Sequence, residues 1–216
     1  MSTVILIACR YFPCRFGLEA LSRKVLGSHI HVDFAANTDE LSCSLSRKNY
    51  DILICDTVLK GINNFALVEK VLSHHKTLKI LIASITSNAV FASRYYDLGA
   101  FGYVCTDDND ELFKRALHNI SNGRKFFYGI DDTIAIERER MRTNNPFDLL
   151  SKREFVVMMQ LLQGKYIKEI AANLSLGLST VSTYRIRILK KMKVKTLVEL
   201  SMIAREYNLL IPYLEQ

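Results

Sequence analysis

The chain has 216 residues, of which 49% are hydrophobic and 24% charged, with 9 Gly and 3 Pro. This composition excludes a wholly disordered or collagen-like chain, and the length allows one large domain or two small ones. No apolar run approaches the ~20 residues that a membrane span needs. The first apolar run is short and has no basic lead-in, which predicts a strand rather than a signal peptide. We therefore expect a soluble protein of the cytoplasm.

The formal net charge of +7 is unevenly distributed. Residues 1–147 carry 18 Lys and Arg against 16 Asp and Glu, whereas residues 148–216 carry 11 against 6. Residues 179–195 hold six basic residues and no acidic one. A compact basic stretch beside a nearly neutral region is typical of a nucleic-acid interface. The alternative for charge alone is a solvated helix face.

The five cysteines include no C-x-x-C pair, and no Cys/His cluster has the ligand spacing of a zinc site. We expect reduced thiols, most of them packed as small hydrophobic residues, with neither a metal site nor a cofactor.

Strand-like and helix-like patterns alternate over the first ~120 residues. Strands are expected at 4–8, 31–35, 51–56, 79–84 and 99–105. Helices are expected at 14–26, from Thr38 or Asp39 through Leu45, and at 65–74, 88–98 and 108–121. Five such units predict an α/β fold, a doubly wound, flavodoxin-like, five-stranded parallel sheet with helices on both faces. Ligand chemistry in such sheets lies at the carboxyl ends of the strands.

Turn signals at Asn122-Gly123 and Thr143–Pro146 interrupt this pattern. They predict a first domain over 1–121, a linker over 122–147 and a second domain over 148–216. The second domain shows only helical patterns, at 151–163, 167–174, 178–193 and 196–207, and is expected to be all-α. Ser151 and Glu154 have the spacing of a capping box.

The helix expected from Ser179, as its N-cap, has an apolar face of Val181, Ile188 and Met192 and a basic opposite face. With the short helix 167–174 and Gly177 between them, it forms the helix-turn-helix pattern. Arg185, Arg187, Lys190 and Lys191 are the candidates for phosphate contacts. Ser182 and Thr183 are better placed to reach base edges.

Leu-Ser-x-Arg-Glu at 150–154, Lys-Glu-Ile-Ala at 168–171, Ser-Thr-Val at 179–181 and Lys191-Met192 resemble the LuxR-type, or NarL/FixJ-type, DNA-binding domain. Ser182-Thr-Tyr-Arg further resembles its BvgA/EvgA-like branch. The resemblance implies a partner, double-stranded promoter DNA, bound by a homodimer, with a heterodimer with another regulator as the alternative. Thr180 and Tyr184 complete the expected DNA-binding residues.

The five strand–helix units of the first domain, with Asp56 at the end of the third strand and Ser84 at the end of the fourth, resemble the receiver of two-component response regulators. Asp56 ends the third strand, where that family carries its phosphoacceptor, and Ser84 holds the switch position. The location of the family's acidic pair, which holds Mg²⁺, reads Ile7-Ala8-Cys9-Arg10 with no acid, and the family's Lys after the fifth strand is Thr106. The resemblance therefore predicts a degenerate receiver with a vestigial Asp56. Whether Arg10 pairs with Asp56 or points to solvent stays open.

Together these patterns predict a sequence-specific DNA-binding transcription regulator that acts without phosphorylation and is not an enzyme. The alternatives are a conventional regulator switched by phosphorylated Asp56 and a partner subunit that modifies another regulator. A small flavodoxin-like enzyme would need a Gly-rich phosphate loop, a nucleophile with a base, or a metal cluster, and the sequence offers none of these.

Overall fold

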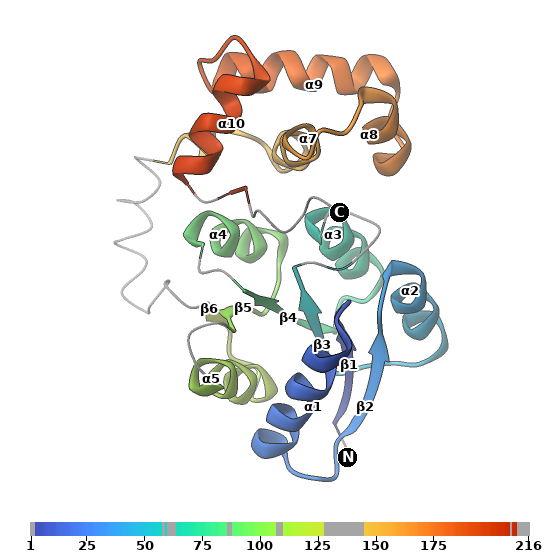
Figure 1. The fold of residues 1–216 in the computed structure, drawn as a ribbon. Helices are drawn as coiled ribbons and strands as arrows, with labels where there is room; N and C mark the ends of the chain where they lie inside the picture. The colour runs from blue at the N-terminus through green and yellow to red at the C-terminus, as the bar shows by residue number, and fades with distance from the viewer. Residues whose placement is uncertain are drawn as a thin grey trace. The chain divides into compact units, whose positions relative to one another are not determined.

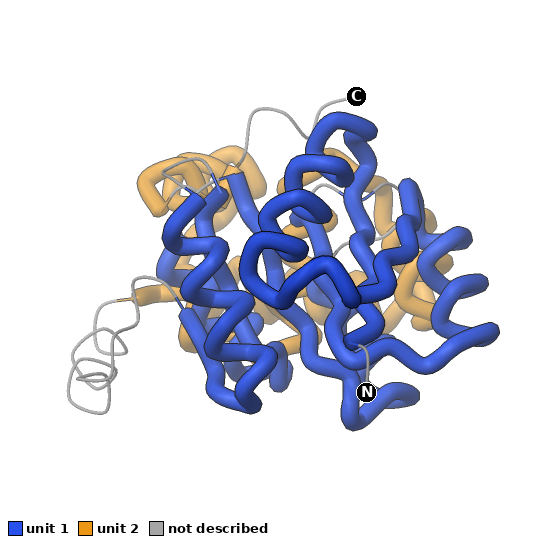
Figure 2. Tube along the Cα trace, turned by 90° about the horizontal axis from the view of Figure 1, so that it is seen from below, with its two compact units in different colours: residues 1–131 blue, residues 132–216 orange. Residues whose placement is uncertain are grey.

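The structure, a computed structural model, describes residues 3–57, 59, 64–85, 88–106, 110–127, 145–207 and 209–210. The chain divides into two compact units, residues 1–131 and 132–216, which Figure 2 colours separately. Each unit is described by itself below. No helix in the described ranges is both long and apolar enough to cross a membrane.

The first unit is built on a wholly parallel six-stranded sheet in the order β2-β1-β3-β4-β5-β6 (Figure 1). Its strands are β1 Val4–Ala8, β2 His31–Ala35, β3 Ile52–Asp56, β4 Lys79–Ser84, β5 Gly102–Cys105 and β6 Phe126–Phe127. The doubly wound parallel sheet expected from the sequence is confirmed. Its inner strands are continuous apolar runs because helices cover both faces.

Five helices complete this unit: α1 Phe12–Leu26, α2 Thr38–Arg47, α3 Asn64–His74, α4 Ala89–Leu98 and α5 Asp110–Ser121. In Figure 1, α1 and α5 lie on one face of the sheet, and α2, α3 and α4 on the other. Alternate strand residues such as Ile5, Ile54 and Val104 pack under α1 and α5. On the opposite face Phe65, Tyr95 and Tyr103 form a stack, with ring centroids 4.4 and 6.0 Å apart.

The sixth strand was not among the five expected from the sequence. It lies inside the segment expected to be a linker, whose residues 128–144 are outside the described ranges. Its approach to β5 depends on Gly102. A Cβ there would lie 2.7 Å from Ile120 Cδ1, 2.8 Å from Phe126 O and 2.9 Å from Leu81 Cδ1. Only a residue without a side chain leaves room for both α5 and β6.

The strand order leaves β2 at one edge of the sheet, and this strand carries a carboxylate in its middle. Asp33 Oδ2 accepts hydrogen bonds from Lys48 Nζ at 2.9 Å and from Tyr50 Oη at 2.8 Å. The side chain of Asp33 is one-third exposed, so solvent reaches this polar group.

The second unit holds η1 Pro146–Leu149, α7 Lys152–Leu162, α8 Ile167–Leu174, α9 Leu178–Lys191 and α10 Leu197–Glu206. The expected all-helical architecture is confirmed. Packing centres on α7, which contacts α8, α9 and α10. Phe147, Phe155 and Ile188 are fully buried in its core. The Ser151/Glu154 capping box is present, with Ser151 N donating to Glu154 Oε2 at 2.8 Å.

Two helix starts differ from the sequence expectation. Asn37, rather than Thr38 or Asp39, caps α2, because its side-chain oxygen accepts from the amides of Asp39 and Glu40. Ser179 does not cap α9, since that helix begins one residue earlier, at Leu178. Both errors are shifts of one or two residues at a helix end.

Candidate nucleic-acid interface and the carboxyl edge of the sheet

Asp56, the last residue of β3, lies at the carboxyl edge of the sheet and is 9% exposed. The parallel register pairs Ala8 of β1 with Cys55 of β3, so the next residue along each strand, Cys9 and Asp56, are neighbours. Cys9 Sγ donates a hydrogen bond to Asp56 Oδ2 at 3.2 Å. Burial of this thiol, and then the nearby Asp56 carboxylate, raise the pKa of Cys9 well above its ordinary value. Cys9 is therefore a protonated donor at neutral pH.

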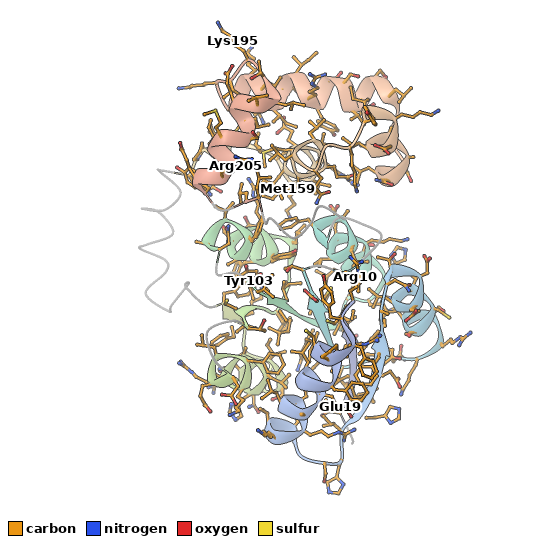
Figure 3. All side chains as sticks on the ribbon, in the orientation of Figure 1. Arg10, Glu19, Tyr103, Met159, Lys195 and Arg205 are labelled. Atoms are coloured by element: carbon orange, nitrogen blue, oxygen red, sulfur yellow. The ribbon has the colours of Figure 1, made fainter. Side chains whose placement is uncertain are left out.

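Arg10 is exposed and turns away from this contact. Its Cζ lies 5.8 Å from the ring centroid of Tyr11, in cation–π geometry. The ion pairs of the described residues include none between Arg10 and Asp56. Figure 3 labels Arg10 just beyond the end of β1. The question left open by the sequence is answered in favour of a solvent-facing Arg10.

Ser84 and Thr106 lie at the ends of the next two strands along the sheet. Ser84 is fully buried. Its carbonyl oxygen accepts from Thr106 N at 2.7 Å and from Thr106 Oγ1 at 3.0 Å. The Thr106 hydroxyl is thus directed back onto the end of β4. At this position the family's Lys would supply a cation, whereas Thr106 supplies a neutral hydroxyl.

The residues at this edge do not suit Mg²⁺, the ion that the receiver family implies. One contact of Asp56 is with the Cys9 thiol, whereas Mg²⁺ demands oxygen ligands in near-octahedral geometry. No group of three or more His, Cys, Asp or Glu side chains within the described parts of the chain is placed to hold a metal ion.

In the second unit, α8 and α9 form the helix-turn-helix. Ser175 ends α8 in the left-handed region, with φ 53°, and the chain then turns through Gly177 into α9. Val181 and Ile188 anchor α9 in the core, both fully buried, and they hold its opposite face outward. One side of α9 is therefore fixed in the core, and the opposite side faces solvent.

The predicted DNA-binding residues of α9 differ in their exposure. Thr180, Thr183, Arg185, Arg187, Lys190 and Lys191 are exposed, and Ser182 and Tyr184 are half-buried. Thr183 Oγ1 donates to Ser179 O at 2.9 Å. Because its proton is used within the helix, the Thr183 hydroxyl is left as an acceptor only.

Lys191 differs from the other basic residues because it is held by the core. Its Nζ lies 2.6 Å from Glu154 Oε2, and the Glu154 side chain is only 4% exposed. Burial alone would raise the pKa of Glu154, but the Lys191 ammonium and the Ser151 hydrogen bonds hold it below its ordinary value. Arg187 and Lys190 line an open pocket with this pair. Lys191 therefore joins α9 to α7 as well as adding charge.

Sequence reasoning missed two contacts at these sites. The bond between Cys9 and Asp56 depends on the β1–β3 register, and the pair of Lys191 with Glu154 on the packing of α9 against α7. For the first contact the sequence does hold a signal, because Cys9 directly follows one expected strand and Asp56 ends another. No local pattern signals the second.

Two family models match separate parts of the chain. Residues 16–117 match the family described as "Response regulator receiver domain". Residues 148–204 match "Bacterial regulatory proteins, luxR family".

Two relatives align with most of this chain. The Fimbriae Z protein of Escherichia coli (strain K12) is 29% identical over 214 residues, 96% of this chain and 99% of that protein. Response regulator GacA of Pseudomonas viridiflava is 27% identical over 161 residues, 74% of this chain and 75% of that protein.

Among solved structures, the fold is similar to RcsB from Salmonella enterica serovar Typhimurium bound to promoter rprA in the presence of phosphomimetic BeF3⁻. The TM-score is 0.77 at 18% identity, covering 98% of this chain and all of that one.

Proposed function

Since the chain is a LuxR/NarL-type response regulator with receiver and GerE domains, and hence a DNA-binding transcription regulator, we propose that it works without phosphorylation of Asp56. In this proposal it binds promoter DNA sequence-specifically as a homodimer in the cytoplasm. The receiver is degenerate, and α9 reads the DNA. We assign the α9 sequence Ser182-Thr-Tyr-Arg185 to the BvgA/EvgA-like branch.

The observation that carries the proposal is the hydrogen bond from Cys9 Sγ to Asp56 Oδ2. To accept a phosphoryl group, the carboxylate must attack while cations neutralise the charge on the transferring oxygens. A thiol stands where the family has an acid, Arg10 turns to Tyr11, and Thr106 bonds to Ser84 O. Removing one such stabiliser typically costs about 2.7–4 kcal/mol, so the loss of two makes transfer negligible.

The DNA-binding part of the proposal rests on α9 and its charge. Arg185, Arg187 and Lys190 are exposed cations on a helix anchored by Val181 and Ile188. Cations on such a helix contact phosphates, and its polar residues near the N-terminus reach base edges. The likeness to an RcsB bound to promoter DNA supports this interface.

The homodimer is supported by a solved structure described as two RcsB dimers bound to two parallel DNAs, to which this chain is similar with a TM-score of 0.55. Dimeric helix-turn-helix proteins bind half-sites about one helical turn apart. We expect a footprint of two such half-sites.

The deciding experiment treats the purified protein with acetyl phosphate and Mg²⁺ and measures its intact mass. A conventional receiver in the same buffer serves as the positive control, and Asp56→Asn as the negative control. We expect no added phosphoryl group, and gel-shift affinity for promoter DNA that treatment leaves unchanged. Labelling at Asp56 with tighter DNA binding would restore the conventional switch. A protein that shifts DNA only when mixed with a second regulator would be a partner subunit.

A further inference from the structure

Ile186 is an apolar side chain on α9 that is 67% exposed. Single exposed apolar residues are common on protein surfaces, so exposure alone carries no meaning. What distinguishes Ile186 is its place. It lies on the side of α9 away from the buried Val181 and Ile188, and the exposed Arg185 and Arg187 lie to either side of it around the helix.

On a helix, residues three and four apart share one face. Ile186 therefore lies one turn after Ser182 and Thr183 and one turn before Lys190. Of the polar residues nearest to it, Thr183 has already given its proton to Ser179 O at 2.9 Å. Thr183 thus offers a methyl group and an acceptor oxygen. The centre of the outward face is more apolar than the charge of the helix suggests.

In the major groove each base pair shows a distinct set of groups, and the C5-methyl of thymine is the apolar one among them. An isoleucine placed over a guanine or cytosine edge would cover polar atoms without bonding them, which is unfavourable. Placed over thymine, it would remove two apolar surfaces from water.

We propose that Ile186 determines DNA-sequence specificity by contacting the C5-methyl of a thymine in each half-site. This inference rests on the proposed function, because it requires α9 to enter the major groove. Ile186 would then read bases together with Ser182 and Thr183, although its side chain has no hydrogen-bonding group.

The test uses the full chain and duplex DNA enriched from a random library by repeated rounds of binding. Each thymine of the best site is replaced in turn by deoxyuridine, which removes only the C5-methyl. Affinity is measured by fluorescence anisotropy at one fixed salt concentration. At one position in each half-site, the replacement is expected to weaken binding about four-fold per half-site, the effect of one buried methyl group.

Two variants locate the methyl contact. Ile186→Ser should bind the thymine and deoxyuridine sites equally, because the side chain that meets the methyl is gone. Arg187→Ala is the matched control, expected to weaken binding to both sites while keeping their four-fold ratio. Ile186 is exposed, so the Ser variant should melt at the temperature of the wild type.

The outcomes separate the two proposals. If the wild type binds selected DNA but no deoxyuridine position weakens it, the assignment to Ile186 is overturned and DNA binding stands. The assignment is likewise overturned if Ile186→Ser keeps the thymine preference, since the methyl is then sensed by another group or through DNA shape. If no sequence is enriched from the library, the proposed function itself fails.

Discussion

The Cys9 thiol and the Asp56 carboxylate are joined by a hydrogen bond of 3.2 Å, Sγ to Oδ2, between the ends of two adjacent parallel strands. The thiol is 1% exposed. A neutral donor thus holds the carboxylate at the position where a receiver would bring a metal ion to it. In the proposed function, the carboxyl group acts as a hydrogen-bond acceptor and not as a phosphoacceptor.

This contact predicts that Asp56→Asn leaves DNA affinity and transcription nearly unchanged. The amide can be oriented to present its oxygen to Cys9 Sγ, so the bond is kept and only the charge is lost. The comparison is made by genome-wide mapping of bound DNA in cells carrying either version. A loss of occupied sites in the Asn strain would contradict the prediction.

Thiol reactivity should divide the five cysteines into two groups. Cys14 and Cys43 are exposed, whereas Cys9, Cys55 and Cys105 are buried. A thiol reagent at pH 8 should label the two exposed thiols quickly and the three buried ones only after denaturation. Burial keeps the reagent from the thiol, and for Cys9 and Cys55 it also raises the pKa, so that little of the reactive thiolate forms. Peptide mass mapping gives the sites. Rapid labelling of Cys9 in the native protein would contradict the assigned hydrogen bond.

Alkaline pH should destabilise the receiver-like unit. Burial raises the pKa of Cys55 to about 12, above its ordinary value of 9.0. Between these two pKa values, the unfolded chain has lost a thiol proton that the folded chain keeps. The free energy of unfolding therefore falls as the pH rises from 9 towards 12. For one group the decrease is at most about 1.4 kcal/mol per pH unit. Denaturant unfolding at a series of pH values measures the slope. Cys55→Ala should reduce it.

Lys191 and Lys190 should give different phenotypes although they are neighbours. Lys191→Ala leaves the buried Glu154 carboxylate without its ammonium partner and should cost about 1–3 kcal/mol of unfolding free energy. Lys190→Ala should change stability by less than about 0.5 kcal/mol but weaken DNA binding. Urea unfolding and anisotropy separate the two effects. Equal loss of stability in both variants would contradict the assignment.

The acid response follows from the same pair. The pKa of Glu154 is held below its ordinary value of 4.5, so the stabilisation is present above pH 4.5 and is lost as the pH falls through the lowered value. On acidification, the free energy of unfolding of the Lys191→Ala variant should therefore decrease less than that of the wild type.

Phosphate contacts should be visible in the salt dependence. If Arg187 and Lys190 each neutralise one phosphate, each Ala variant should reduce the slope of log affinity against log salt by about 0.9. The loss should be similar for all DNA sequences. Unchanged slopes in both variants would remove them from the interface.

Gly102→Ala should destabilise the sheet by about 1–3 kcal/mol, because one of the atoms that its Cβ would meet is the backbone oxygen of Phe126. The control is Gly17→Ala within α1, where a Cβ meets nothing within 4 Å. That change should be neutral or stabilising by about 0.5–1 kcal/mol. Thermal unfolding compares the two.

Elements with a strong hydrophobic pattern could be predicted from the sequence. Elements that form only by pairing with another part of the chain could not. The inner strands Val4–Ala8, Ile52–Asp56 and Lys79–Ser84 are mainly apolar runs that can be recognised in the sequence. The two residues Phe126–Phe127 are too few to show a period, and only their pairing with β5 makes them a strand. At the candidate site, charge made Arg10 one candidate partner of Asp56, with a solvent-facing Arg10 as the alternative. The uncharged Cys9 takes that place because the strand register, not electrostatics, decides which side chain is adjacent.

The edges of the sheet restrict how two copies of this chain can associate. Strand β6 has two residues, and β2 carries Asp33 with its Lys48 and Tyr50 partners. Short edge strands and charged edge residues resist the addition of a strand from another molecule. A homodimer would therefore form through helix faces rather than by joining two sheets into one. For the same reason, the substitution Asp33→Val should increase the formation of β-rich aggregates.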